Sequence, residues 1–170
     1  MSLFSSARLF RVAAALTVAL AISACSKNPN DDPNAAGLAG AGAGAATPGS
    51  QQDFVVNVGD RVFFDTDSVE LNANAQATLD KQARWLNQYG RYSFTIEGHA
   101  DERGTREYNF ALGSQRAEAT KNYLIARGVA PQRMKTISYG KERPVAVCND
   151  ISCWSQNRRA VTVLGGGAGS

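Results

Sequence analysis

Two oppositely charged side chains, Asp101 and Arg116, stand where they could bind a small ligand. Asp101 lies in the polar stretch Gly98–Thr105, which follows a predicted strand, and Arg116 lies in the helix predicted after it. A fixed carboxylate binds an ammonium group, and the planar guanidinium of arginine binds a carboxylate through two parallel hydrogen bonds. The pair therefore suits a zwitterion such as an amino acid. The same two residues could instead form a structural ion pair between loop and helix.

His99 raises the alternative of an enzyme. In an extended segment Glu97, His99 and Asp101 project to the same side, as in a general-base cluster or part of a metal site. His99 is the single histidine of the chain, and the sequence contains neither a nucleophile motif nor a phosphate-binding glycine loop. A lone histidine beside a carboxylate is typical of a hydrogen-bonded structural residue. We therefore predict that the protein is not an enzyme and binds no metal or cofactor.

The elements that must position these residues alternate between strand and helix from residue 53 to residue 164. Strand patterns cover 61–64, 92–97, 134–139 and 160–164, and helical patterns cover 72–89 and 107–127. Asn72 is a suitable N-cap for the first helix, and Gly128 suits the end of the second. Helices that return the chain to one sheet predict an α+β domain in the order β-α-β-α-β(β), with the helices on one face.

The N-terminus reads as an export signal over residues 1–24. Arg8 and Arg11 precede an apolar run from Val12 to Ile22, and small residues follow before Cys25. At about 1.5 Å per residue, this run is much shorter than the roughly 30 Å of a bilayer core. The segment resembles a bacterial lipobox, which implies cleavage before Cys25 and a covalent lipid on its thiol. The alternative is an uncleaved helix lying at the membrane interface.

Net charge and localisation follow from this segment. The formal charge is +3, and removing Arg8 and Arg11 leaves +1, so the mature chain lacks the concentrated positive charge of a nucleic-acid-binding protein. Ser26 stands where lipoproteins retained in the inner membrane often carry Asp. We therefore expect a lipid anchor in the outer membrane, with the folded domain facing the periplasm.

The composition also predicts a linker over residues 25–52, a flexible tail over 165–170 and a disulfide. Gly, Ala, Pro and Asn dominate residues 26–52, which could not bury enough apolar area to offset the entropy of ordering. Cys148 and Cys153 remain as an even pair in an oxidising compartment, which favours a disulfide. A metal site is the competing interpretation, but one histidine leaves no convincing set of ligands.

Six blocks of sequence, in this order, resemble the OmpA-like peptidoglycan-binding domain family. They are Phe63–Asp67, Glu97–Thr105, Tyr108–Gly113, Gln115–Ala117, Ser138–Pro144 and Asn157–Val161. With the lipobox and linker, the resemblance covers the whole chain. It implies a mixed sheet packed against helices on one face. One departure is Gly113, where many members of the family have Ser, so a local cap or hydrogen bond would be missing.

The resemblance implies that the ligand is the diaminopimelate residue of the peptidoglycan stem peptide. Asp101 would bind its ammonium group and Arg116 its carboxylate. Phe64, Asp65 and Thr66 would offer a wall and backbone N–H groups, although an Asp at such a place also caps turns. The remaining residues implied to line or close the pocket are Asn109, Leu112 and Arg158. For Arg158, the alternative is a solvated position before an edge strand.

The resemblance also implies partners and a role. Lipoproteins of this kind tether the outer membrane to the cell wall and work with the Tol system, including its periplasmic propeller protein, in envelope integrity and cell division. Two alternatives stay open. One is a wall-binding lipoprotein without Tol partners, and the other is a peptidoglycan hydrolase that uses His99 and Asp101.

Overall fold

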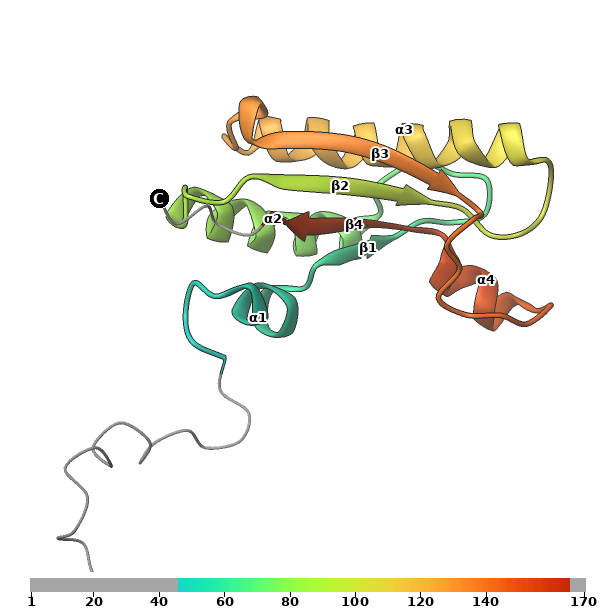
Figure 1. The fold of residues 1–170 in the computed structure, drawn as a ribbon, viewed down its shortest axis with the longest axis horizontal. Coiled ribbons are helices and arrows are strands. Elements are labelled where there is room, and N and C mark those ends of the chain that lie inside the picture. The colour runs from blue at the N-terminus through green and yellow to red at the C-terminus, as the bar shows by residue number, and fades with distance from the viewer. Residues whose placement is uncertain (1–45, 166–170) are drawn as a thin grey trace, which may run out of the picture. The chain divides into compact units, whose positions relative to one another are not determined.

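The structure is a computed structural model that describes residues 46–165 (Figure 1). The predicted signal peptide (1–24), the lipidated Cys25, most of the predicted linker and residues 166–170 lie outside the described residues.

A mixed sheet of four strands forms the centre of the domain. The strands are β1 (Arg61–Phe63), β2 (Phe94–His99), β3 (Met134–Gly140) and β4 (Arg159–Leu164). Their order is β1-β4-β2-β3, with β2 parallel to β3 and β4 antiparallel to both of its neighbours (Figure 1). The α+β class and the mixed sheet predicted from the sequence are confirmed.

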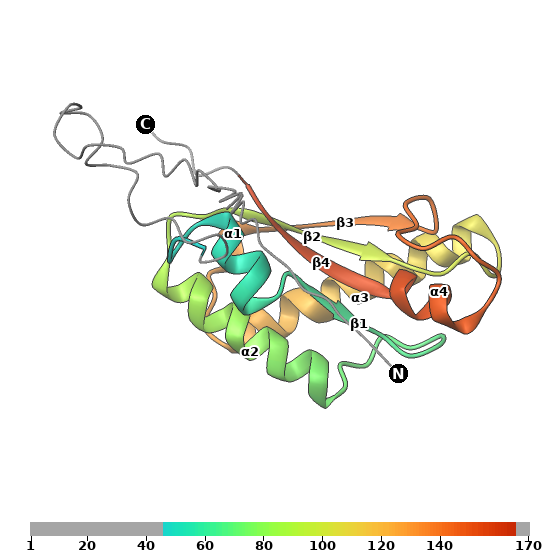
Figure 2. The same cartoon turned by 90° about the horizontal axis from the view of Figure 1, so that it is seen from below.

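Two long helices pack along one face of this sheet (Figure 2). They are α2 (Ala73–Gln88) and α3 (Arg106–Ala126). The predicted Asn72 cap is present, because its side chain accepts a hydrogen bond of 3.0 Å from the N–H of Ala75. Residues of alternate sheet positions, including Phe94 and Ile96, are buried beneath the helices. Helix α3 connects the parallel strands β2 and β3, and so begins beside the end of β2.

The packing of α3 against β2 explains the glycine at position 113. A Cβ atom on Gly98 would lie 1.8 Å from the carbonyl oxygen of Gly113, and a Cβ on Gly113 would lie 2.5 Å from Oγ of Ser138. Glycine at both positions lets the helix and strand backbones approach closely. The close packing of α3 against β2 therefore requires glycine at position 113, and this requirement outweighs the loss of a cap or hydrogen bond from a serine.

The folded domain begins earlier than residue 53, which corrects the predicted boundary of the linker. Helix α1 (Gln51–Asp53) continues into the π-helix η2 (Phe54–Val58). The indole N–H of Trp85 donates to Asp53 at 2.8 Å, and the hydroxyl of Tyr92 donates to the carbonyl of Gly49 at 2.8 Å. Composition suggested a free coil, but these two aromatic side chains supply partners for it. At the other end, the N–H of Gly165 donates to Ser93, so this first residue of the predicted tail is bound.

Between β3 and β4 the chain forms a short helix, α4 (Ile151–Asn157), which the sequence analysis did not predict. Asp150 caps it, accepting from the N–H of Ser152 at 2.7 Å. The predicted disulfide joins Cys148 to Cys153, with 5.7 Å between their Cα atoms. The 3-10 turn η3 (Pro131–Arg133) precedes β3. Within residues 46–165, no helix combines the length and apolar character that crossing a membrane requires.

Candidate ligand-binding pocket

A pocket of about 280 Å³ opens between the loop after β1, the loop after β2 and the first turns of α3. Its lining consists of Thr66, Asp67, Asp101, Arg103, Gly104, Tyr108, Asn109, Leu112 and Arg116. Of the eight ligand-binding residues predicted from the sequence, Thr66, Asp101, Asn109, Leu112 and Arg116 therefore line one pocket. The fold gathers them because the β1 loop and the start of α3 meet at the same end of the sheet.

The other three predicted residues lie behind the lining. Arg158 is buried and donates to the carbonyl of Phe64 at 3.0 Å and to the carboxylate of Asp101 at 3.2 Å. The carbonyl of Asp65 accepts from Arg116 at 3.2 Å. The N–H of Phe64 is bonded to the carbonyl of Arg158 at 2.9 Å, so it is not offered to a ligand as the resemblance implied. These three residues support the pocket from behind.

Arg116 is fully buried, and all three of its guanidinium nitrogens donate to backbone carbonyls. Nε bonds to Ser68 at 2.9 Å, Nη1 to His99 at 2.8 Å and Nη2 to Asp65 at 3.2 Å. Burial, together with the charge of Arg158, lowers the pKa of Arg116 to about 10, so the side chain stays protonated at neutral pH. Arg116 therefore gives the pocket a fixed positive charge and joins three chain segments.

Asp101 is also nearly buried, and its carboxylate is already paired. Arg103 donates to it from Nη2 at 2.7 Å, from Nε at 3.1 Å and from its backbone N–H at 3.2 Å. Arg158 adds a contact of 3.2 Å. Burial alone would raise the pKa of Asp101, but these hydrogen bonds outweigh it and hold the pKa below its usual value. The carboxylate is therefore ionised, and its partners in this structure are Arg103 and Arg158.

The start of α3 fixes the loop that carries Asp101. The Thr105 side chain caps the helix by accepting from the N–H of Tyr108 at 3.2 Å. The buried amide of Asn109 donates to the carbonyls of Arg103 and Thr105 at 2.7 and 3.0 Å. Asn109 thus holds the loop in shape, in addition to lining the pocket.

Four lining residues were missed by the sequence analysis: Asp67, Arg103, Gly104 and Tyr108. Tyr108 donates its hydroxyl hydrogen bond to Asp67, which raises the pKa of Tyr108. Gly104 has a φ of 84°, a backbone conformation that favours glycine. The bond from the backbone N–H of Arg103 to Asp101 could have been predicted, because an Asp side chain commonly accepts a hydrogen bond from the N–H two residues on.

His99 lies on the face of the sheet opposite α3, and its surroundings correct one expectation. Neither ring nitrogen has a hydrogen-bond partner within residues 46–165, and the nearest carboxylate oxygen, from Glu97, is 3.7 Å from Nε2. The ring lies beside that of Tyr139, tilted by 32°, with 5.6 Å between the ring centroids. Burial and the charges of Arg159 and Arg143 lower the pKa of His99 to about 4. The predicted hydrogen-bonded role is therefore wrong, and His99 is a neutral packed side chain.

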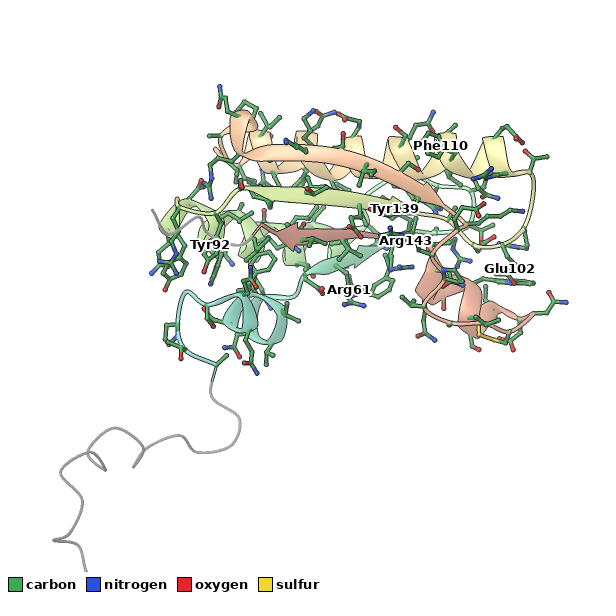
Figure 3. The ribbon with its side chains drawn as sticks, viewed as in Figure 1. Arg61, Tyr92, Glu102, Phe110, Tyr139 and Arg143 are labelled. Atoms are coloured by element: carbon green, nitrogen blue, oxygen red, sulfur yellow. A yellow bond between two sulfur atoms is a disulfide. The ribbon has the colours of Figure 1, made fainter. Side chains whose placement is uncertain are left out.

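The pocket combines two carboxylates, Asp67 and Asp101, with two guanidiniums, Arg103 and Arg116. This arrangement can bind a small group that carries both charges. Among residues 46–165 no three His, Cys, Asp or Glu side chains are grouped to hold a metal ion. A larger groove of about 540 Å³ lies on the other side of the α3 start, beside Phe110 and Tyr139 (Figure 3), and it contains none of the predicted ligand-binding residues.

Comparison with known proteins identifies the family. The OmpA family profile matches residues 63–158, more than half of the chain. The chain belongs to the OmpA family. Among its relatives, the peptidoglycan-associated lipoprotein of Rhizobium meliloti (strain 1021) is 70% identical over 92% of this chain and 88% of that protein. The protein of the same description from Pseudomonas aeruginosa is 41% identical, over 86% of this chain and 91% of its own length.

Solved structures agree with this membership of the OmpA family. The crystal structure of the peptidoglycan-associated lipoprotein from Burkholderia pseudomallei matches with a TM-score of 0.61 and 43% identity, over 62% of this chain and 90% of that one. The C-terminal domain of Helicobacter pylori MotB matches with a TM-score of 0.60 and 22% identity, over 64% and 86% of the two chains. The second similarity shows a shared fold alone.

Proposed function

We propose that the chain is an outer-membrane lipoprotein that binds peptidoglycan without cleaving it and tethers the membrane to the cell wall. The lipid on Cys25 would hold the chain in the outer membrane, and the domain would face the periplasm. A lipid anchor raises the effective concentration of the wall near the pocket, so a weak single-site affinity is sufficient. Membership of the OmpA family and the names of the relatives support this assignment.

The ligand we propose is the diaminopimelate residue of the stem peptide. The observation that carries this proposal is the pocket that holds Asp101 beside the fixed charge of Arg116. The free end of diaminopimelate carries an ammonium and a carboxylate on one carbon, which are complementary to these two side chains. A pocket of about 280 Å³ suits such an end group better than a whole sugar or a long peptide.

The partners we propose besides the wall are proteins of the Tol system, including its periplasmic propeller protein, in envelope constriction during division. The nearest alternative is a wall-binding lipoprotein without Tol partners. A pull-down with the mature lipoprotein distinguishes them, because the alternative retains the wall and loses the propeller protein. A peptidoglycan hydrolase is a second alternative, whose sign is the release of soluble wall fragments by the purified protein.

Calorimetric titration of the mature lipoprotein in detergent with a diaminopimelate-containing stem peptide tests the ligand. We expect saturable binding that Asp101→Asn reduces about tenfold or more, since it removes one charge at nearly unchanged size. A stem peptide with lysine in place of diaminopimelate is the matched ligand control, because lysine lacks the second carboxylate. Absence of binding by the folded wild-type chain would contradict the proposal.

A further inference from the structure

The carboxylate proposed to bind the ligand is covered by one movable side chain. Asp101 is bonded by two guanidiniums, and they differ in exposure. The side chain of Arg158 is 7% exposed and packed behind the pocket, whereas that of Arg103 is 41% exposed. An ammonium group can therefore reach Asp101 only if Arg103 gives way.

The guanidinium of Arg103 can leave Asp101 and stay in contact with the ring of Trp154. This guanidinium stacks on the ring of Trp154 in α4, with 4.2 Å between the guanidinium carbon and the ring centroid. The indole N–H of Trp154 donates to the carboxylate of Glu102, which lies beside α4 (Figure 3). A rotation of the outer bonds of Arg103 would keep the stacking contact while exchanging the carboxylate of Asp101 for the charge of Glu102.

We propose that Arg103 is a lid on Asp101: it holds the place of the ligand's ammonium group in the free pocket and moves aside, along the face of Trp154, when the ligand binds. The proposal rests on the proposed function. Because the lid competes with the ligand, the apparent affinity is reduced by the fraction of open pockets. A partly exposed ion pair favours the closed arrangement about fivefold.

Titration of the diaminopimelate stem peptide against lid variants tests this inference. We expect Arg103→Ala to bind about fivefold more tightly than wild type. The loop should keep its shape, because the bonds from Asn109 reach the backbone of residues 103 and 105. Arg106→Ala is the matched control: it removes the same charge three residues on, from a side chain that is 74% exposed and paired with Glu142. Its affinity should not change.

Trp154 is a positioning residue in this proposal, and a double-mutant cycle isolates its role. Trp154→Ala should change the affinity for the stem peptide when Arg103 is present and leave it unchanged in the Arg103→Ala background. Trp154→Phe retains an aromatic face and should keep most of the wild-type behaviour. The carboxyl NMR titration of Asp101 supplies a second readout. Its pKa should rise in Arg103→Ala, where Arg158 and the more distant Arg116 remain as neighbouring charges.

The outcomes separate the lid from the proposed function. If wild type binds the peptide and Arg103→Ala binds it equally or more weakly, Arg103 is a ligand contact or a support, and the lid is overturned. Arg103→Gln checks the same point without opening a cavity. If wild type and Arg103→Ala both fail to bind, the proposed ligand is wrong, and the lid falls with it. An equal effect of Trp154→Ala in both backgrounds would show that Trp154 acts otherwise than through Arg103.

Discussion

Two groups of buried ionisable side chains occupy the same end of the sheet, and they are held in different ways. In the pocket, Arg116 and Asp101 have hydrogen-bond partners for each of their side-chain nitrogen and oxygen atoms. On the opposite face, both ring nitrogens of His99 and Nε of Arg159 have none within residues 46–165. Hydrogen bonds to every polar atom fix the position of a buried charge. The polar atoms of the second group that lack a partner are instead enclosed by packed side chains.

The difference follows from what surrounds each group. Three backbone carbonyls converge on Arg116, so its charge is stabilised in place at the floor of the pocket. His99 faces Arg143, which stacks on the ring of Tyr139 at 3.5 Å (Figure 3), and Arg159. Burial, together with these positive neighbours, lowers the pKa of His99 and keeps the imidazole neutral, and a neutral ring can be buried at a lower cost than a charged one. The first group presents paired charges in the pocket, whereas in the second the positive charges of Arg143 and Arg159 surround a neutral imidazole.

The largest effect should separate the two buried arginines. Arg116→Met removes the side chain that donates to the carbonyls of Asp65, Ser68 and His99, and it should lower the free energy of unfolding by about 3–5 kcal/mol. Arg159→Met should cost about 1–2 kcal/mol, because its two hydrogen bonds are long, at 3.2 and 3.3 Å, and an unpaired Nε is removed with them. Urea unfolding of both variants and wild type measures the difference. Equal losses would mean that hydrogen-bond completeness does not distinguish the two groups.

A smaller effect should appear when His99 is protonated. Its pKa in the folded state is about 4 against an ordinary 6.5, so the neutral form is favoured by folding. That stability is present above pH 6.5 and is lost as the pH falls towards 4, by up to about 3 kcal/mol. Protonation of Asp101 causes a further loss of stability at lower pH, because its pKa lies below 3.8 in the folded state.

Urea unfolding at pH 7, 5.5 and 4 measures this loss. His99→Gln is the control: whatever its stability at pH 7, the decline between pH 7 and pH 4 should be shallower than that of wild type. The comparison of the two groups would fail if wild type and His99→Gln declined in parallel, since His99 would then not be kept neutral by its surroundings.

The long helices and the strands could be predicted from the sequence, but the partners of the buried charged side chains could not. Asn72, Gly128 and the spacing of apolar residues placed the long helices correctly, because caps and periodicity are local signals. The partners of Arg116 come from the loop that contains Asp65 and Ser68 and from the end of β2 at His99, which meet only after the sheet has formed. Arg103 lies two residues from Asp101, yet the ring of Trp154 on which it stacks comes from a helix that the composition did not indicate.

The smallest effect should come from the disulfide, and it bears on the pocket side of the comparison. Replacing Cys148 and Cys153 by Ser removes a short covalent loop and should cost about 2 kcal/mol at most. The base of this segment is held separately, since Asn157 accepts from the N–H groups of Val145 and Ala146 at 2.9 and 3.2 Å. Arg159 therefore keeps its surroundings, whereas α4 and the stacking of Trp154 on Arg103 are loosened.

Hydrogen exchange of the double-Ser variant measures where the loosening occurs. Amides of Ser152 and Trp154 should exchange faster than in wild type, while those of Val145 and Ala146 should be unchanged, because the Asn157 bonds do not depend on the disulfide. Uniformly faster exchange across the domain would mean that the disulfide stabilises the whole fold and not α4 alone. It would also link the two groups of ionisable side chains, which the structure holds through separate contacts.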